Sequence, residues 1–371
     1  MSIAWHAGDR RREGETLIGL SKMFRARGNT PGDAVSAGRE AVTIFRELGD
    51  RRNESAALVA FGGALSDKKQ TGEAVRILGQ AVAISREAGD QRGEASALCE
   101  LSRSLIDLNR IREAAEAVER AAAIFHETGD RRAECRALGD LGYCHLEMGQ
   151  AAASVEAGRR AVALARETGL LTIEAGLLLN LGRALLGVKL FEEAVAVSQQ
   201  AVMSISKLDS VRTVPIGDDH RQPEPRRLGM ALSTLGCAFL ELEQYPESIE
   251  ASRQALAILD EAGVSSYRAE TLTHLASALG NTGRYEEALD TYHQAALTYR
   301  ELTDPRSENM IQINLSNNLL HMNRYEEALE WGRRAAIFFH KTGDHGYATK
   351  ALFNSSRRSP NSPGTRKTCT S

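Results

Sequence analysis

The amino-acid sequence predicts an all-α protein, a right-handed superhelix of about eight helix-turn-helix repeats with a partial ninth. Three observations support this prediction. A Gly-Asp pair recurs forty residues apart, at Gly49-Asp50, Gly89-Asp90 and Gly129-Asp130. Between the pairs the chain is rich in the helix formers Ala, Leu, Glu and Arg. At 371 residues it is also too long for one ordinary hydrophobic core, which favours several domains or a repeat array.

Each Gly-Asp pair is expected to end one helix and begin the next. Glycine takes up the left-handed backbone conformation that closes a helix without steric cost. The aspartate after it can accept a hydrogen bond from the first turn of the following helix. The pattern resumes after an insertion at Gly263, Thr303-Asp304 and Gly343-Asp344. Pro305 fits a first helical position, where its missing N–H does no harm.

A second break falls in the middle of each period. Gly283-Arg284-Tyr285-Glu286-Glu287-Ala288 is a near copy of 323–328, where the glycine is replaced by asparagine. Each period therefore holds two helices of about 16 to 18 residues joined by short turns, the αα-hairpin unit of a solenoid.

Three columns of residues recur in all eight periods and predict the packing between helices. A large apolar column comprises Leu20, Phe61, Leu101, Leu141, Leu181, Leu235, Leu275 and Leu315. A small column comprises Ala34, Ala74, Ala114, Ser154, Ala194, Ser248, Ala288 and Ala328. A third is alanine throughout: Ala41, Ala81, Ala121, Ala161, Ala201, Ala255, Ala295 and Ala335. Small residues let paired helices approach closely, while large ones fill the space between neighbours.

The repeats divide the chain into two arrays separated by an insertion. Repeats 1 to 5 are expected near 10–49, 50–89, 90–129, 130–169 and 170–207, and repeats 6 to 8 with the partial ninth at 228–356. The insertion at 208–227 contains Pro215, Pro223 and Pro225, which predicts an exposed loop. It is either a tolerated insertion or a hinge or partner contact. The polar tail at 357–371 is expected to be disordered.

Both ends of the array look uncapped. Gly8-Asp9 repeats the end-of-repeat signal, so the chain is expected to begin in the middle of a repeat, and the ninth repeat is partial. An uncapped solenoid end exposes the apolar face meant for the next repeat, which makes self-association through the ends an expectation.

The columns, together with the pairs Leu141-Gly142, Leu181-Gly182 and Leu235-Gly236, resemble the tetratricopeptide repeat. The resemblance covers about residues 10 to 356. The forty-residue period is similar to the long-helix variant of kinesin light chains and LGN-type adaptors. The sequence motif Gly-Asp-Arg-Arg-x-Glu also resembles motifs in the repeat arrays of bacterial STAND and NB-ARC-type regulators.

The resemblance implies that the first helix of each repeat lines a concave groove. It implies peptide contacts from positions beside the Leu-Gly pair, where Asn180, His274, Asn314 and Asn317 lie. The long-helix relatives use asparagines there to hold a peptide backbone. Here Asn180 and Asn314 match that pattern and the other repeats do not, so the asparagine ladder is incomplete.

Two arginines and a tyrosine at the lining positions indicate a binding surface. Arg103 and Arg183, on either side of Tyr143, could hold a carboxylate in forked hydrogen bonds with the tyrosine ring as a platform. The alternative is that these are solvated residues selected for solubility.

Composition and motifs argue against several classes of function. A net charge of −3 disfavours a nucleic-acid surface, and no apolar run is long enough for a membrane span. Five cysteines without C-x-x-C spacing disfavour a disulfide framework or a metal site and favour the cytoplasm. No phosphate loop, G-x-G-x-x-G after a strand, H-E-x-x-H or G-x-S-x-G motif occurs, so neither catalysis nor a cofactor is expected.

The sequence therefore predicts a non-catalytic scaffold that binds a partner peptide or helix in its groove. The alternative is a regulatory or sensor arm of a bacterial STAND-type signalling ATPase or transcriptional regulator, of which this chain would be a fragment.

Overall fold

The turns that the repeat pattern marks set the helix boundaries. The computed structural model describes residues 2–28, 30–211 and 224–356. The glycine of the recurring pair has a positive φ, as at Gly49 and Gly89, both at 66°. The aspartate after it caps the next helix: the Asp50 carboxylate accepts from the backbone N–H of Asn53. The equivalent bond is made by Asp90, Asp130 and Asp304. These pairs end one helix and begin the next, as predicted.

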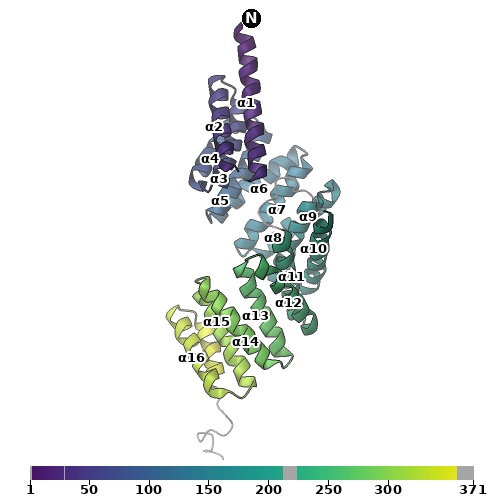
Figure 1. Ribbon diagram of the computed structural model, residues 1–371, viewed down its shortest axis with the longest axis vertical. Coiled ribbons are helices and arrows are strands. Elements are labelled where there is room, and N and C mark those ends of the chain that lie inside the picture. The colour runs from purple at the N-terminus through teal and green to yellow at the C-terminus, as the bar shows by residue number, and fades with distance from the viewer. Residues whose placement is uncertain (1, 29, 212–223, 357–371) are drawn as a thin grey trace, which may run out of the picture. The chain divides into compact units, whose positions relative to one another are not determined.

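Within the described ranges the chain forms seventeen helices and no strand (Figure 1). They are α1 (Ser2–Arg27), α2 (Pro31–Glu47), α3 (Arg51–Asp67), α4 (Thr71–Glu87), α5 (Gln91–Asp107), α6 (Ile111–Glu127), α7 (Arg131–Glu147), α8 (Ala151–Thr168), α9 (Leu171–Gly187), α10 (Phe191–Val211), α11 (Glu224–Glu241), α12 (Tyr245–Glu261), α13 (Ser265–Asn281), α14 (Tyr285–Glu301), α15 (Pro305–His321), α16 (Tyr325–Lys341) and α17 (His345–Ser356). Each repeat is an odd-numbered helix followed by an even-numbered one, and α17 starts the partial ninth. The prediction of an all-α repeat solenoid is confirmed.

The first helix differs from its prediction. Gly8-Asp9 is not a turn, because α1 runs without a break from Ser2 to Arg27. At Gly49-Asp50 the turn joins two helices that pack against each other, α2 and α3. The same dipeptide therefore has two structures in one chain.

The predicted insertion is shorter than expected where the structure describes it. Helix α10 continues to Val211 and α11 begins at Glu224. Both ends of the 208–227 segment are thus helical, and Pro225 occupies the first turn of α11, where proline is tolerated. Its centre, 212–223, and the predicted tail at 357–371 lie outside the described residues.

The helices fall into two compact units. Unit 1 contains α1 to α9, and unit 2 contains most of α10 together with α11 to α17. The division between Lys189 and Leu190 lies inside the fifth predicted repeat, not at the insertion.

Each unit has two layers of helices. Several odd-numbered helices contact the next odd-numbered one, as α1 does α3 and α3 does α5 in unit 1, and as α11 does α13 and α15 does α17 in unit 2. No two even-numbered helices make comparable contact in the described part of the chain. The odd-numbered helices therefore lie on the inner side of the curvature of each unit, and we call their solvent-facing surface the inner face.

The three sequence columns form the core between the layers. Every alanine of the third column is fully buried, and every member of the small column is at most 2% exposed. In the large column Leu20 and Leu101 are half-buried, and the other six members are buried. On the last two helices, α16 and α17, the apolar side chains of Ile337, Leu352 and Phe353 are exposed. Self-association through this end stays a prediction.

A recurring contact between a basic side chain and a glutamate joins five pairs of consecutive repeats. A glutamate in the first turn of an odd-numbered helix, its side chain at most 15% exposed, meets a basic side chain eight residues earlier, at the end of the preceding helix. The pairs are Arg46–Glu54 (3.0 Å), Arg86–Glu94 (3.1 Å), His126–Glu134 (2.9 Å), Arg166–Glu174 (2.7 Å) and Arg300–Glu308 (2.6 Å). The glutamate of the Gly-Asp-Arg-Arg-x-Glu motif therefore links one repeat to the next.

Repeat 7 carries the same link with its charges exchanged. Arg268 occupies the glutamate position of α13 and Asp260 the arginine position of α12, with Nε and Oδ1 2.6 Å apart. Arg268 also donates through Nη1 to the Thr298 hydroxyl at 2.5 Å.

Exchanging the charge of one member of this pair should destabilise unit 2, and exchanging both should restore it. Arg268→Glu brings two carboxylates together and removes the donor to Thr298, so we expect a loss of about 1 kcal/mol. Adding Asp260→Arg recreates the orientation found in the other repeats and should recover most of that loss. Urea unfolding of the wild type, both single variants and the double variant measures the coupling. A double variant no more stable than Arg268→Glu would contradict the prediction.

Candidate functional site

The seven residues predicted to line a groove fall into two sets, one in each unit. Arg103, Tyr143, Asn180 and Arg183 lie on α5, α7 and α9 of unit 1, and His274, Asn314 and Asn317 lie on α13 and α15 of unit 2. All seven are on odd-numbered helices.

Arg103 is already engaged by carboxylates of its own chain. Its Nη1 donates to Oε1 of Glu100 at 2.6 Å, one helical turn earlier, and its Nε lies 3.7 Å from the Asp140 carboxylate on α7. Tyr143, three residues beyond Asp140, is half-buried. An acidic partner group would have to compete with Glu100 for this guanidinium.

Arg183 has a similar but looser environment. Its guanidinium lies 3.8 Å from the Glu147 carboxylate on α7, and both side chains are about one-third exposed (30% and 36%). Asn180, one turn earlier on α9, is half-buried. Arg103 and Arg183, which are predicted to bind a partner's carboxylate, thus both lie beside carboxylates of this chain.

A third arginine, Arg25 of α1, lies across the inner face of unit 1. Its Nε donates to Asp67 of α3 at 2.7 Å, and its Nη2 donates to Oε2 of Glu100 on α5 at 3.3 Å. Glu100 therefore receives Arg103 on one oxygen and Arg25 on the other. Burial by itself would lower the pKa of Arg25, but the charges of Glu100 and Asp67 outweigh it and the pKa is raised.

The path of Arg25 depends on a glycine. A Cβ added to Gly63 of α3 would lie 2.2 Å from Nη1 of Arg25 and 2.4 Å from its Cζ. The missing side chain leaves the space in which the guanidinium lies.

Sequence reasoning missed Arg25 and Asp67. They lie three and four residues beyond Lys22 and Gly63, the lining positions of their repeats, and hence one further helical turn along the same face. The i, i+3/i+4 spacing was the available signal.

On the inner face of unit 2, α13 carries the polar side chains His274 and Ser277. His274 is half-buried, and its ring nitrogen Nδ1 is buried without a hydrogen-bond partner among the described residues. Burial lowers the pKa of His274 to about 4, so the imidazole is neutral near pH 7. Ser277, one turn on, shares a hydrogen bond of 3.0 Å with the Tyr292 hydroxyl.

The two asparagines of α15 present side-chain amides on the same face. Asn314 is half-buried and Asn317 exposed. Neither amide makes a side-chain hydrogen bond within the part of the chain that the structure describes, whereas the neighbouring Asn318 donates to the Tyr285 carbonyl at 2.8 Å.

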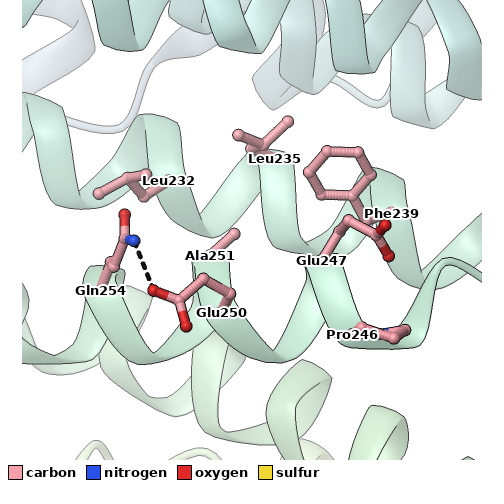
Figure 2. A pocket seen from close by; sticks show the side chains of 8 residues that line it. All are labelled: Leu232, Leu235, Phe239, Pro246, Glu247, Glu250, Ala251 and Gln254. Atoms are coloured by element: carbon pink, nitrogen blue, oxygen red, sulfur yellow. Dashed lines mark hydrogen bonds between the residues drawn. The ribbon is translucent and has the colours of Figure 1, made fainter.

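A cleft of about 420 Å³ lies between α11 and α12 of unit 2 (Figure 2). Its apolar side is formed by Leu232, Leu235 and Phe239 of α11. Charged and amide groups of α12 form the other side, where Gln254 donates to Glu250 at 2.7 Å. None of the seven predicted residues lines this cleft.

Two observations bear on metal binding and on thiol reactivity. In the described ranges no three His, Cys, Asp or Glu side chains lie close enough to hold a metal ion. Burial first, and Glu241 and Glu270 next, raise the pKa of the Cys237 thiol on α11 to about 12, so this sulfur is not a thiolate. Among the described residues there is also no helix long and apolar enough to cross a lipid bilayer.

The two-layer arrangement of helix pairs defines an αα-repeat array. Residues 267–336, which include most of α13, all of α14 and α15 and part of α16, match the family model of the tetratricopeptide repeat. These residues are tetratricopeptide repeats, and the remaining helix pairs repeat their fold. No curated protein matches the chain.

Solved structures share this fold at low sequence identity. One is the Signal Transduction ATPase with Numerous Domains (STAND) protein with a tetratricopeptide repeat sensor from Pyrococcus horikoshii: TM-score 0.62 and 14% identity, with 92% of this chain and 48% of that chain covered. A Rap protein complexed with competence and sporulation factor has a TM-score of 0.53 and 13% identity, covering 94% and 96%. Aspartyl phosphate phosphatase F from Bacillus subtilis has 0.50 and 14%, covering 93% of each chain. At such identities the similarity establishes the fold alone.

Proposed function

We propose that this chain is a non-catalytic interaction scaffold that binds a peptide or helix of a partner protein on its inner faces. The proposed contacts are Arg103, Tyr143, Asn180 and Arg183 in unit 1 and His274, Asn314 and Asn317 in unit 2. The observation that supports the proposal most directly is the pair of amides at Asn314 and Asn317. An extended peptide has backbone N–H and C=O groups that a side-chain amide can pair with, because it is both donor and acceptor.

The charge distribution of the two inner faces favours a peptide with a mixed sequence. Unit 1 presents paired charges, as in Arg103 with Glu100 and Arg183 with Glu147. In unit 2 the side-chain amides of Asn314 and Asn317 can hydrogen-bond a peptide backbone. The Rap protein of similar fold, solved with competence and sporulation factor, gives a precedent for ligand binding on this fold. We expect modest affinity, on the order of micromolar, set by a few anchors.

Peptide selection followed by matched variants tests the proposal. Peptides enriched from a random displayed library on the wild-type chain would be labelled and titrated by fluorescence anisotropy. Asn314→Ala and Asn317→Ala should each weaken binding about tenfold, the value of one to two lost hydrogen bonds. The control is Gln294→Ala, which removes an exposed amide from the outer helix α14. Failure to enrich any peptide, or equal affinity for all three variants, would overturn the proposal.

The second candidate is a sensor arm of a larger signalling protein. The structural match to the STAND protein named above favours this candidate, because the match covers 92% of this chain but only 48% of that protein. The genomic reading frame around this sequence tests the candidate. A phosphate-loop motif G-x-x-x-x-G-K-[ST] encoded in frame would support it, and stop codons at both ends would remove it.

A further inference from the structure

We propose that Asp67, Gly63 and Glu100 form an arginine-binding site on the inner face of unit 1, and that Arg25 occupies it as an internal competitor of a partner's arginine. The inference rests on the proposed peptide-binding function and adds the chemistry of one partner side chain. The site is assembled from α3 and α5, whereas its present occupant comes from α1.

The geometry of the site matches a guanidinium. Asp67 accepts from Nε of Arg25 and Glu100 accepts from Nη2, so two carboxylates on different helices hold two edges of one planar group. The third nitrogen, Nη1, lies above Gly63, where a Cβ would come within 2.2 Å. A planar fork with several donors can bridge such a pair, whereas an ammonium group is a single point charge.

The Glu100 carboxylate is held in place by a second arginine. Oε1 of Glu100 accepts from Arg103 at 2.6 Å, which leaves Oε2 directed to the site. Arg103 is then a positioning residue. The Glu100 side chain is 16% exposed but that of Asp67 is 46% exposed, so the site is open to solvent on the Asp67 side. A partner side chain can enter there.

The Arg25 side chain extends beyond the helices against which α1 packs. Helix α1 packs against α2 and α3, and the Arg25 side chain reaches beyond both to α5. The buried groups of α1 include Ile18 and Ser21, and the Ser21 hydroxyl fixes α1 to α2 by donating to the Ala34 carbonyl at 2.8 Å. Packing of α1 therefore does not require Arg25 to lie over Gly63. An extended side chain that spans three helices also loses rotamer entropy, which lowers its advantage over an external ligand.

Removal of the internal competitor should expose the site. The probe is a fluorescein-labelled hexa-arginine peptide, titrated by anisotropy at fixed salt, with hexa-lysine and hexa-glutamate peptides for comparison. If Arg25 occupies the site nine-tenths of the time, Arg25→Ala binds hexa-arginine about tenfold more tightly than the wild type. Hexa-lysine should gain less, and hexa-glutamate should gain nothing.

Arg27→Ala is the matched control for charge. Arg27 lies in the same last turn of α1, is exposed and forms no ion pair within the described residues, so its removal changes net charge equally without opening the site. Gly63→Ala in the Arg25→Ala background controls for geometry, because it fills the site with a methyl group at constant charge. It should return hexa-arginine binding to the wild-type value.

Several results would overturn the proposal. Equal gains in Arg25→Ala and Arg27→Ala would indicate bulk electrostatics, and no gain with a lowered melting temperature would make Arg25 a link between repeats. Arg25→Gln, which keeps hydrogen-bonding capacity without charge, provides a second variant if Arg25→Ala is unstable. Failure here with intact effects of Asn314→Ala and Asn317→Ala removes only the arginine site and leaves the proposed function standing.

Discussion

Gly38→Ala is expected to destabilise unit 1 by about 2 kcal/mol, although glycine to alanine in a helix normally stabilises. Gly38 is buried on α2, where that helix crosses α3. A Cβ at this position would lie 2.8 Å from the Phe61 Cα and 3.0 Å from its backbone nitrogen. Backbone atoms cannot swing aside as a side chain can, so the two helices must separate.

Gly79→Ala is expected to change the free energy of unfolding in the opposite direction. Gly79 also lies in the interior of a helix, α4, but a Cβ there meets nothing within 4 Å. We expect this variant to stabilise the protein by about 0.5–1 kcal/mol through helix propensity alone. Urea unfolding followed by circular dichroism compares both variants with the wild type. The interpretation of Gly38 as a close-approach position fails if both substitutions shift stability in the same direction.

Acidification is expected to destabilise unit 2 through His274. Its folded-state pKa is lowered to about 4, whereas in the unfolded chain it returns to the ordinary value near 6.5. Between these values the unfolded state binds the proton and the folded state does not, so stability falls as pH is lowered from about 6.5 to about 4. The loss amounts to about 3 kcal/mol at the lower limit, at 1.36 kcal/mol for each unit of pKa difference.

His274→Gln should remove that part of the pH dependence. Urea unfolding at pH 7, 6, 5 and 4.5 would be followed by the fluorescence of Trp331 in unit 2. The other tryptophan of the chain, Trp5, would be replaced by phenylalanine in every variant. Other groups titrate in the same range, so the quantity to compare is the difference in stability between the wild type and His274→Gln at each pH. His345→Gln, at an exposed position of α17, is the control. Parallel pH profiles for the wild type and His274→Gln would refute a buried neutral imidazole.

The fold was predictable from the sequence because its signals are local. A glycine in the left-handed conformation and an aspartate cap act within a few residues, so Gly49-Asp50 marks a helix boundary wherever a second helix packs beside the first. Gly8-Asp9 shows where that reasoning stops. Helix α1 continues without a break through the same dipeptide, so the dipeptide alone does not determine a turn.

The inner face was only partly predictable. The repeat register identified the helices and the turn on which Arg103, Tyr143 and Asn314 lie, because side chains three and four residues apart share one face of a helix. It did not identify what each side chain binds. The sequence pattern predicts a partner's carboxylate at Arg103, and the structure adds that Arg103 donates to Glu100, which also accepts from Arg25 two repeats earlier.

The sequence by itself determined the helical class, the repeat length and the buried alanine and leucine columns of this protein, since each follows from periodicity along one chain. The tertiary structure decided which charges meet: the exchanged pair of Asp260 and Arg268, and Arg25 with Asp67 and Glu100 across the space left by Gly63. The physical reason is range. Helix and turn formation depend on neighbours within about four residues, whereas these ion pairs depend on the angstrom-scale approach of separate helices. Asp260 and Arg268 are eight residues apart across a turn, and Arg25 lies 42 and 75 residues before Asp67 and Glu100.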